Sequence, residues 1–123
     1  MQMMENLLKE IPEKTTVTEA ELNELRPVLD FMTDIARESG LNLSYEKTLV
    51  IGIHLLAFMR RVKNNEYLPE LDEEMFDEVS PELVDLSKRV LQKVLKTSER
   101  QLDAAEIFYL TVHFEAAKFN EEG

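Results

Sequence analysis

The two histidines are the side chains in this sequence with the most distinctive chemistry, and both lie among apolar residues. His54 is part of the stretch GIHLLAFMRR at residues 52–61, and His113 is part of EIFYLTVHF at residues 106–114. An imidazole ring can carry a proton near neutral pH, bind a metal ion, or act as a nucleophile that accepts a transferred group. The neighbouring residues indicate which of these reactions the pattern favours.

Two cations lie on the same helical line as His54. At about 100° per residue, Lys47 falls two turns before His54 and Arg61 falls two turns after it. Cations at these positions disfavour an imidazolium and favour an anion attached to the ring. The spacing therefore favours a phosphate acceptor over a proton carrier at His54.

The second histidine, His113, lies at the centre of a broad helical face that it shares with Glu106 and Tyr109. A histidine on such a face is also typical of a core residue that bonds to a neighbouring helix, and this interpretation stays open. The two histidines are fifty-nine residues apart, without a cysteine or a His-x3-His pair, which gives little support to a zinc site. Because no nucleophile–base pair or glycine-rich phosphate loop is readable, we expect no enzyme activity, metal or cofactor.

The elements that must position the histidines are helices. No stretch alternates apolar and polar residues over the length of a strand, so the pattern predicts an all-α fold, a compact bundle of about five helices. Ser44 can cap a helix over residues 45–64 that carries His54. Asp103, with Glu106 three residues later, can cap a last helix that carries His113 and runs to about residue 121.

The remaining helices are also marked by their ends. Thr18 and Glu21 form a capping-box pattern at the start of a helix that Gly40 ends. Pro27 is expected to kink or break this helix. A short helix is expected after residue 69, and Ser80-Pro81 supplies the N-cap and first-turn proline of the next one.

Composition restricts the classes of function. The 123 residues suffice for one ordinary domain, which we expect at residues 17–123, after an N-terminal extension at residues 1–16. The formal net charge of −11 disfavours direct binding to nucleic acid, and the absence of cysteine excludes disulfides. The sequence starts without a secretory signal and has no apolar window near the ~20 residues of a bilayer span. We therefore expect a cytoplasmic protein.

Two stretches resemble the motifs of a known family. AEIFYLTVHFEAA (residues 105–117) closely resembles the second histidine motif of the PTS regulation domain (PRD) family, and IHLLAFMRRVKNNEY (53–67) resembles the first. Both occur in the order and at about the separation found in the family. The agreement covers His54, Leu55, Arg61, Lys63 and Asn64 in the first motif, and Glu106, Tyr109, Leu110, His113, Ala116 and Ala117 in the second. The chain has Ile53 where the family often has an aspartate.

This resemblance implies an all-helical bundle that forms a homodimer and receives phosphoryl groups on histidine from the sugar phosphotransferase system (PTS). The donors would be the phosphocarrier HPr or an EIIB component of a sugar permease. His54 and His113 are the implied phosphoacceptors, and the expected supports of the phosphoryl group are Arg61, Lys47, Tyr109 and Glu106.

Most relatives join two such domains to an RNA-binding or helix-turn-helix domain, for which the 123 residues leave no room. We therefore expect a stand-alone domain that acts through a partner, such as a separate transcriptional regulator. The alternative is a helical dimerisation scaffold whose histidines are buried and not phosphorylated.

Overall fold

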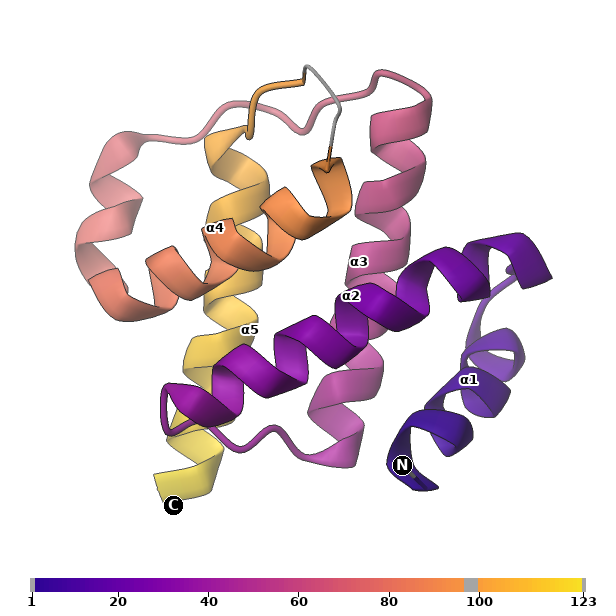
Figure 1. The fold of residues 1–123 in the computed structure, drawn as a ribbon. Helices are drawn as coiled ribbons and strands as arrows, with labels where there is room; N and C mark the ends of the chain where they lie inside the picture. The colour runs from indigo at the N-terminus through magenta and orange to yellow at the C-terminus, as the bar shows by residue number, and fades with distance from the viewer. Residues whose placement is uncertain (1, 97–99, 123) are drawn as a thin grey trace.

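The computed structural model describes residues 2–96 and 100–122, and the side chains of residues 3–96 and 100–118. Every regular element within these residues is helical, as Figure 1 shows, so the expected all-α bundle is confirmed. The elements are α1 (Gln2–Lys14), α2 (Glu19–Glu38), α3 (Tyr45–Lys63), the short 3-10 helix η1 (Glu73–Glu78), α4 (Pro81–Leu95) and α5 (Ala104–Glu122).

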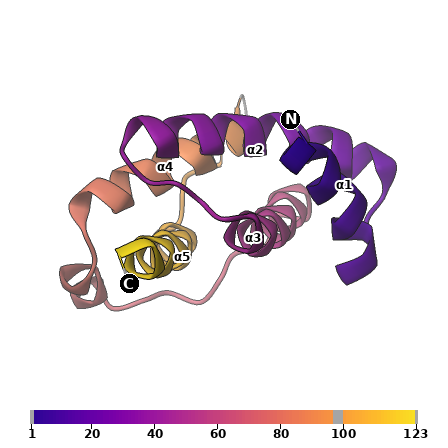
Figure 2. The ribbon, with the colours of Figure 1, turned by 90° about the horizontal axis from the view of Figure 1, so that it is seen from below.

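The long helices form two layers. Figure 2 shows α2 and α4 in one layer and α3 and α5 in the other, with α1 at the edge beside α3 and η1 at the edge beside α5. Helices α3 and α5 pack against each other and run in opposite directions (Figure 1). The two histidine stretches are therefore brought side by side by the second layer.

The core lies between the layers. Each long helix turns its apolar stripe inward, and a fully buried leucine or phenylalanine contributes about 1.5–3 kcal/mol. Its largest fully buried side chains include Leu25, Leu29, Met32, Leu55, Phe58, Leu86, Leu91 and Phe114. This packing fixes how α3 and α5 face each other.

Helix α1 also packs onto the core. Met4, Leu7 and Ile11 are buried against α2 and α3, and the Tyr45 hydroxyl donates a hydrogen bond of 2.8 Å to Glu10 Oε1. The segment that the sequence suggested as an extension thus covers part of the core. The division of the chain at residue 16 stays a prediction.

Helix α2 begins as the sequence predicts. Thr18 Oγ1 accepts from the Glu21 amide at 3.1 Å, and the Glu21 carboxylate accepts from the Thr18 amide at 2.9 Å. The Arg60 guanidinium also binds this carboxylate and, with the Thr18 amide, lowers the pKa of Glu21 to about 2. Pro27 lies inside α2 without breaking it, and Gly40 follows the helix end with a left-handed φ of 84°.

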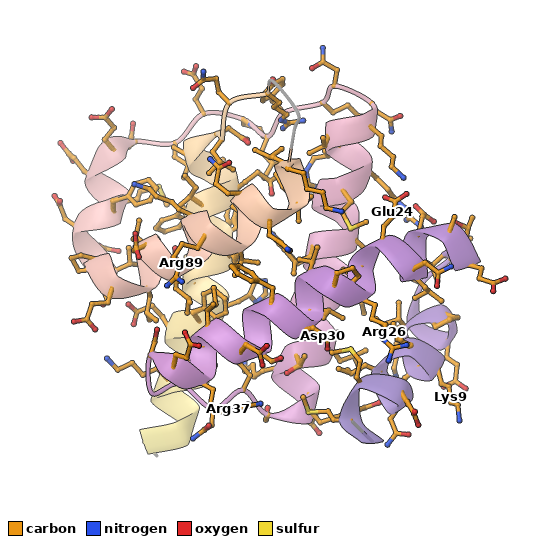
Figure 3. All side chains as sticks on the ribbon, viewed as in Figure 1. Lys9, Glu24, Arg26, Asp30, Arg37 and Arg89 are labelled. Atoms are coloured by element: carbon orange, nitrogen blue, oxygen red, sulfur yellow. The ribbon has the colours of Figure 1, made fainter. Side chains whose placement is uncertain are left out.

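The outer face of the α2–α4 layer is charged. The side chains of Arg26, Asp30, Arg37 and Arg89 point from these two helices into solvent (Figure 3). Of the helices described, none is both long enough and apolar enough to cross a bilayer.

Candidate functional site

The antiparallel pairing of α3 and α5 places the two histidines in contact. The ring centroids of His54 and His113 are 5.2 Å apart, and the rings meet edge to face at 66°. The cap of α3 is the one predicted, because Ser44 Oγ accepts from the Lys47 amide at 3.2 Å. The prediction that each histidine lies in the middle of its own helix is confirmed, and the structure adds that they form one site.

A buried ion pair, formed by residues two turns from the histidines along each helix, reaches to the histidine pair. Arg61 follows His54 by seven residues, and Glu106 precedes His113 by seven residues, so the same register brings them together. The Arg61 guanidinium binds the Glu106 carboxylate with both arms, at 2.6 Å from Nε to Oε1 and 3.1 Å from Nη2 to Oε2. The Glu106 side chain is 0% exposed, whereas that of Arg61 is 21% exposed.

This ion pair corrects one expectation about the start of α5. The helix does follow Asp103, but the Glu106 carboxylate that a capping box would use is bound by Arg61. Both Glu106 oxygens accept from Arg61 instead, because the side chain is turned toward α3 and away from the helix end.

The inner nitrogen of His54 faces the same carboxylate. Its Nε2 lies 3.8 Å from Glu106 Oε2, which is too long for a hydrogen bond, and it is a buried atom without a hydrogen-bond partner among the described residues. Burial, the adjacent His113 and the charge of Arg61 lower the pKa of His54 to about 4. His54 is therefore a neutral imidazole at physiological pH, with 17% of its side chain exposed.

Fewer charged or titratable neighbours affect His113 than affect His54. Burial and the charge of Lys47 lower the pKa of His113. Lys47 precedes His54 by two turns on α3, so Lys47 and Arg61 approach the imidazole pair from opposite ends of the seam between α3 and α5. The charge of Arg61 thus acts on His54, and the charge of Lys47 acts on His113.

Glu106 differs from Lys47 and Arg61 among the expected supports of the phosphoryl group, because its side chain is acidic. Burial raises the pKa of the Glu106 carboxyl, and the hydrogen bonds from Arg61 oppose that shift. A carboxylate repels a phosphoryl group, so Glu106 can act on such a group only through its hold on Arg61.

Apolar side chains surround the histidines on the outer face of α3 and α5. Val50 is one turn before His54 and is 47% exposed, while Tyr109 and Val112 on α5 are 42% and 41% exposed. The Tyr109 ring meets Phe108 edge to face at 5.8 Å. This face is apolar, in contrast to the charged face of α2 and α4.

One contact of the site was missed by the sequence reasoning. Arg100 Nη1 donates to the backbone oxygen of Arg61 at 3.1 Å, and the Arg100 guanidinium lies 3.8 Å from the centroid of the Tyr67 ring. These contacts tie the α4–α5 connection to the end of α3, where the segment between α3 and η1 crosses (Figure 1). No local spacing signals them, because the partners lie far apart in the chain.

A metal site would also need two histidines and a carboxylate, and the structure does bring His54, His113 and Glu106 together. The carboxylate is already bound at both oxygens by Arg61, and the charge of Lys47 reaches His113. Two cations beside the imidazoles oppose the binding of a third. Within the described part of the chain, no group of three or more possible ligands has the arrangement of a metal site.

The fold and this site define an all-helical domain with a histidine pair at the contact of two antiparallel helices. A model of the PRD domain matches residues 29–117, so the chain belongs to the PRD family. The crystal structure of a PRD-containing transcription regulator from Lactobacillus casei is similar, with a TM-score of 0.74 and 26% sequence identity over 93% of this chain and 94% of that one. A comparison with curated proteins finds no match.

Proposed function

We propose that this PRD domain is a phosphorylation-responsive regulatory domain of the sugar phosphotransferase system. The supporting observation is the contact of His54 with His113, two neutral imidazoles with Lys47 and Arg61 at either end. A neutral ring has a nucleophilic lone pair, and the cations stabilise the phosphoryl group that it receives. The donors that the family implies are HPr and EIIB, and we propose that the protein acts with them in the cytoplasm.

The transfer itself needs only a lone pair on the acceptor ring. A histidine nitrogen attacks the phosphorus of a phosphohistidine or phosphocysteine on the donor, and a P–N bond forms as the donor's P–N or P–S bond breaks. The donor nitrogen or sulfur leaves with the electron pair. The proton on the other ring nitrogen of the acceptor stays there or passes to water.

The exposed surface of α3 and α5 around the histidines also suggests what the phosphoryl group controls. Val50, Tyr109 and Val112 expose apolar surface around the histidines, and a second copy of the chain would cover it. Each phosphoryl group adds about two negative charges at neutral pH. Charge placed within such an interface changes how two copies pair, and a separate transcriptional regulator reads the result, since the net charge of −11 disfavours direct contact with nucleic acid.

The phosphorylation is tested with purified enzyme I, HPr, phosphoenolpyruvate and a panel of EIIB proteins. We expect acid-labile phosphate on the wild-type protein, less in His54→Ala and His113→Ala, and none in the double variant, as measured by intact-protein mass spectrometry at alkaline pH. Wild-type protein without label under all donors would refute phosphorylation and favour the scaffold alternative, which the buried Nε2 of His54 supports.

The pairing is tested separately by sedimentation velocity. We expect the unmodified protein to dimerise and the phosphorylated protein to show a changed dimer fraction. Tyr109→Ser should weaken the dimer, and Arg89→Ser on the charged face of α4 is the matched control. Monomers before and after phosphorylation would contradict this part of the proposal.

A further inference from the structure

We propose that the two histidines are phosphorylated in a fixed order, His113 before His54, and that Glu106 is the gate that imposes this order. The inference rests on the proposed function and deepens it, because it assigns different roles to the two acceptors. The gate is the carboxylate of Glu106 together with the two hydrogen bonds that it accepts from Arg61.

His54 is blocked in the unmodified protein. Its Nε2 is buried and lies 3.8 Å from Glu106 Oε2, so the carboxylate repels an anionic phosphoryl donor that approaches this atom. A phosphoryl group there would also meet a negative carboxylate. The cation that could stabilise it, Arg61, already binds both oxygens of Glu106.

His113 lacks this obstacle. Within the described side chains, no oxygen of Glu106 lies within 4 Å of a His113 ring nitrogen, whereas one lies 3.8 Å from His54 Nε2. The cation whose charge reaches it is Lys47, and the ammonium group of Lys47 has no ion pair among the described residues. A phosphoryl group on His113 therefore finds a cation that does not first have to leave an internal carboxylate.

Phosphorylation of His113 then opens the gate. The new dianion lies against the His54 ring, whose centroid is 5.2 Å from that of His113, and it competes with Glu106 for the guanidinium of Arg61. When Arg61 turns toward the phosphoryl oxygens, Glu106 loses its partner and takes a proton from water. Burial raises the pKa of Glu106, which favours this uptake. His54 Nε2 then faces a neutral carboxyl group, and Arg61 offsets part of the negative charge of the phosphoryl group on His113.

The order is tested with potassium phosphoramidate, a small donor that phosphorylates histidine without PTS proteins. Residue-specific label is followed over time by mass spectrometry in the wild type and in His113→Ala. A like charge within about 4–6 Å shifts a pKa by about one unit or more, which is a factor of ten. We expect the same repulsion to act on the phosphoryl donor, so label at His54 should lag label at His113 by at least about tenfold. In His113→Ala, His54 should stay unlabelled over the same period.

In Glu106→Gln the lag should disappear, and His54 should be labelled as fast as His113. Glu115→Gln is the matched control, because Glu115 is also on α5 but accepts from the Ser80 amide at 2.7 Å and not from Arg61. It should keep the wild-type order. If Glu106→Gln does not fold, Glu106→Ser carries the same test, since it removes the carboxylate and keeps the cation of Arg61.

The outcomes separate the two proposals. Equal rates at both histidines in the wild type, or a lag that persists in Glu106→Gln or in Glu106→Ser, would overturn the gate and leave the proposed function intact. Failure of enzyme I, HPr and EIIB to label the protein, with an ordered reaction toward phosphoramidate, would instead overturn the proposed function alone.

Discussion

Replacing His54 with glutamine should make the stability of the protein less dependent on pH. The folded state lowers the pKa of His54 from 6.5 to about 4, chiefly because burial disfavours the charged ring. The unfolded chain binds the proton more readily, so protonation favours unfolding. This contribution to stability is fully present above pH 6.5 and is lost as the pH falls toward 4.

The size of the effect follows from the shift. At 1.36 kcal/mol per pKa unit, the change from 6.5 to about 4 corresponds to about 3 kcal/mol when the ring is fully protonated in both states. At pH 5 the ring is protonated in the unfolded chain but mostly neutral in the fold, so the loss relative to pH 7.5 is about 2 kcal/mol. Glutamine cannot titrate and carries no such loss.

Urea unfolding at several values between pH 5 and 7.5 measures this difference. The free energy of unfolding of the wild type should fall by about 2 kcal/mol more than that of His54→Gln over this range. Burial also lowers the pKa of His113, so both proteins are compared again in a His113→Gln background. Parallel pH profiles for the wild type and His54→Gln in both backgrounds would refute the burial argument.

Three further changes test the fold around the site. Glu106→Ala leaves Arg61 without its partner and should lower the unfolding free energy by about 3 kcal/mol, with clear non-additivity in a double-mutant cycle with Arg61→Met measured by urea unfolding. Gly52→Ala should raise the melting temperature, because a Cβ atom there would meet Leu29 Cδ2 at an ordinary 3.5 Å and alanine favours a helix over glycine by up to about 1 kcal/mol. Thr18→Ala removes the cap of α2 and should cost about 1 kcal/mol in the same measurement.

Local signals were enough to predict most of the fold. The capping pattern at Thr18 and the cap at Ser44 depend on neighbouring residues only, and the structure has both. At Pro27 the local signal predicts a kink or break, but the helix continues through it. Its ring removes one backbone donor, but the helix on both sides is fixed by buried residues such as Leu25 and Leu29, so tertiary packing overrides the local break.

The site was only half readable from the sequence. The line of Lys47, His54 and Arg61 follows from the helical period alone, and so does the position of His113 on its own helix. The contact of the two rings and the partner of Arg61 depend on how α3 and α5 are aligned, which no spacing within either helix determines. The same holds for the stacking of Arg100 on Tyr67.

The local charge at the site is a better measure of the proposed signal than the charge of the whole chain. Lys47, Arg61 and Glu106 together give the seam between α3 and α5 a formal charge of +1 when both imidazoles are neutral. One phosphoryl group of about two negative charges brings that charge to about −1, or to about zero once Glu106 takes up a proton, while it changes the total of −11 by less than a fifth. Charges farther apart than about 8 Å are largely screened at physiological salt, whereas partly buried ones are not. A partner that covers this face therefore no longer meets a positive charge at the histidines, even though the rest of the acidic surface is almost unchanged.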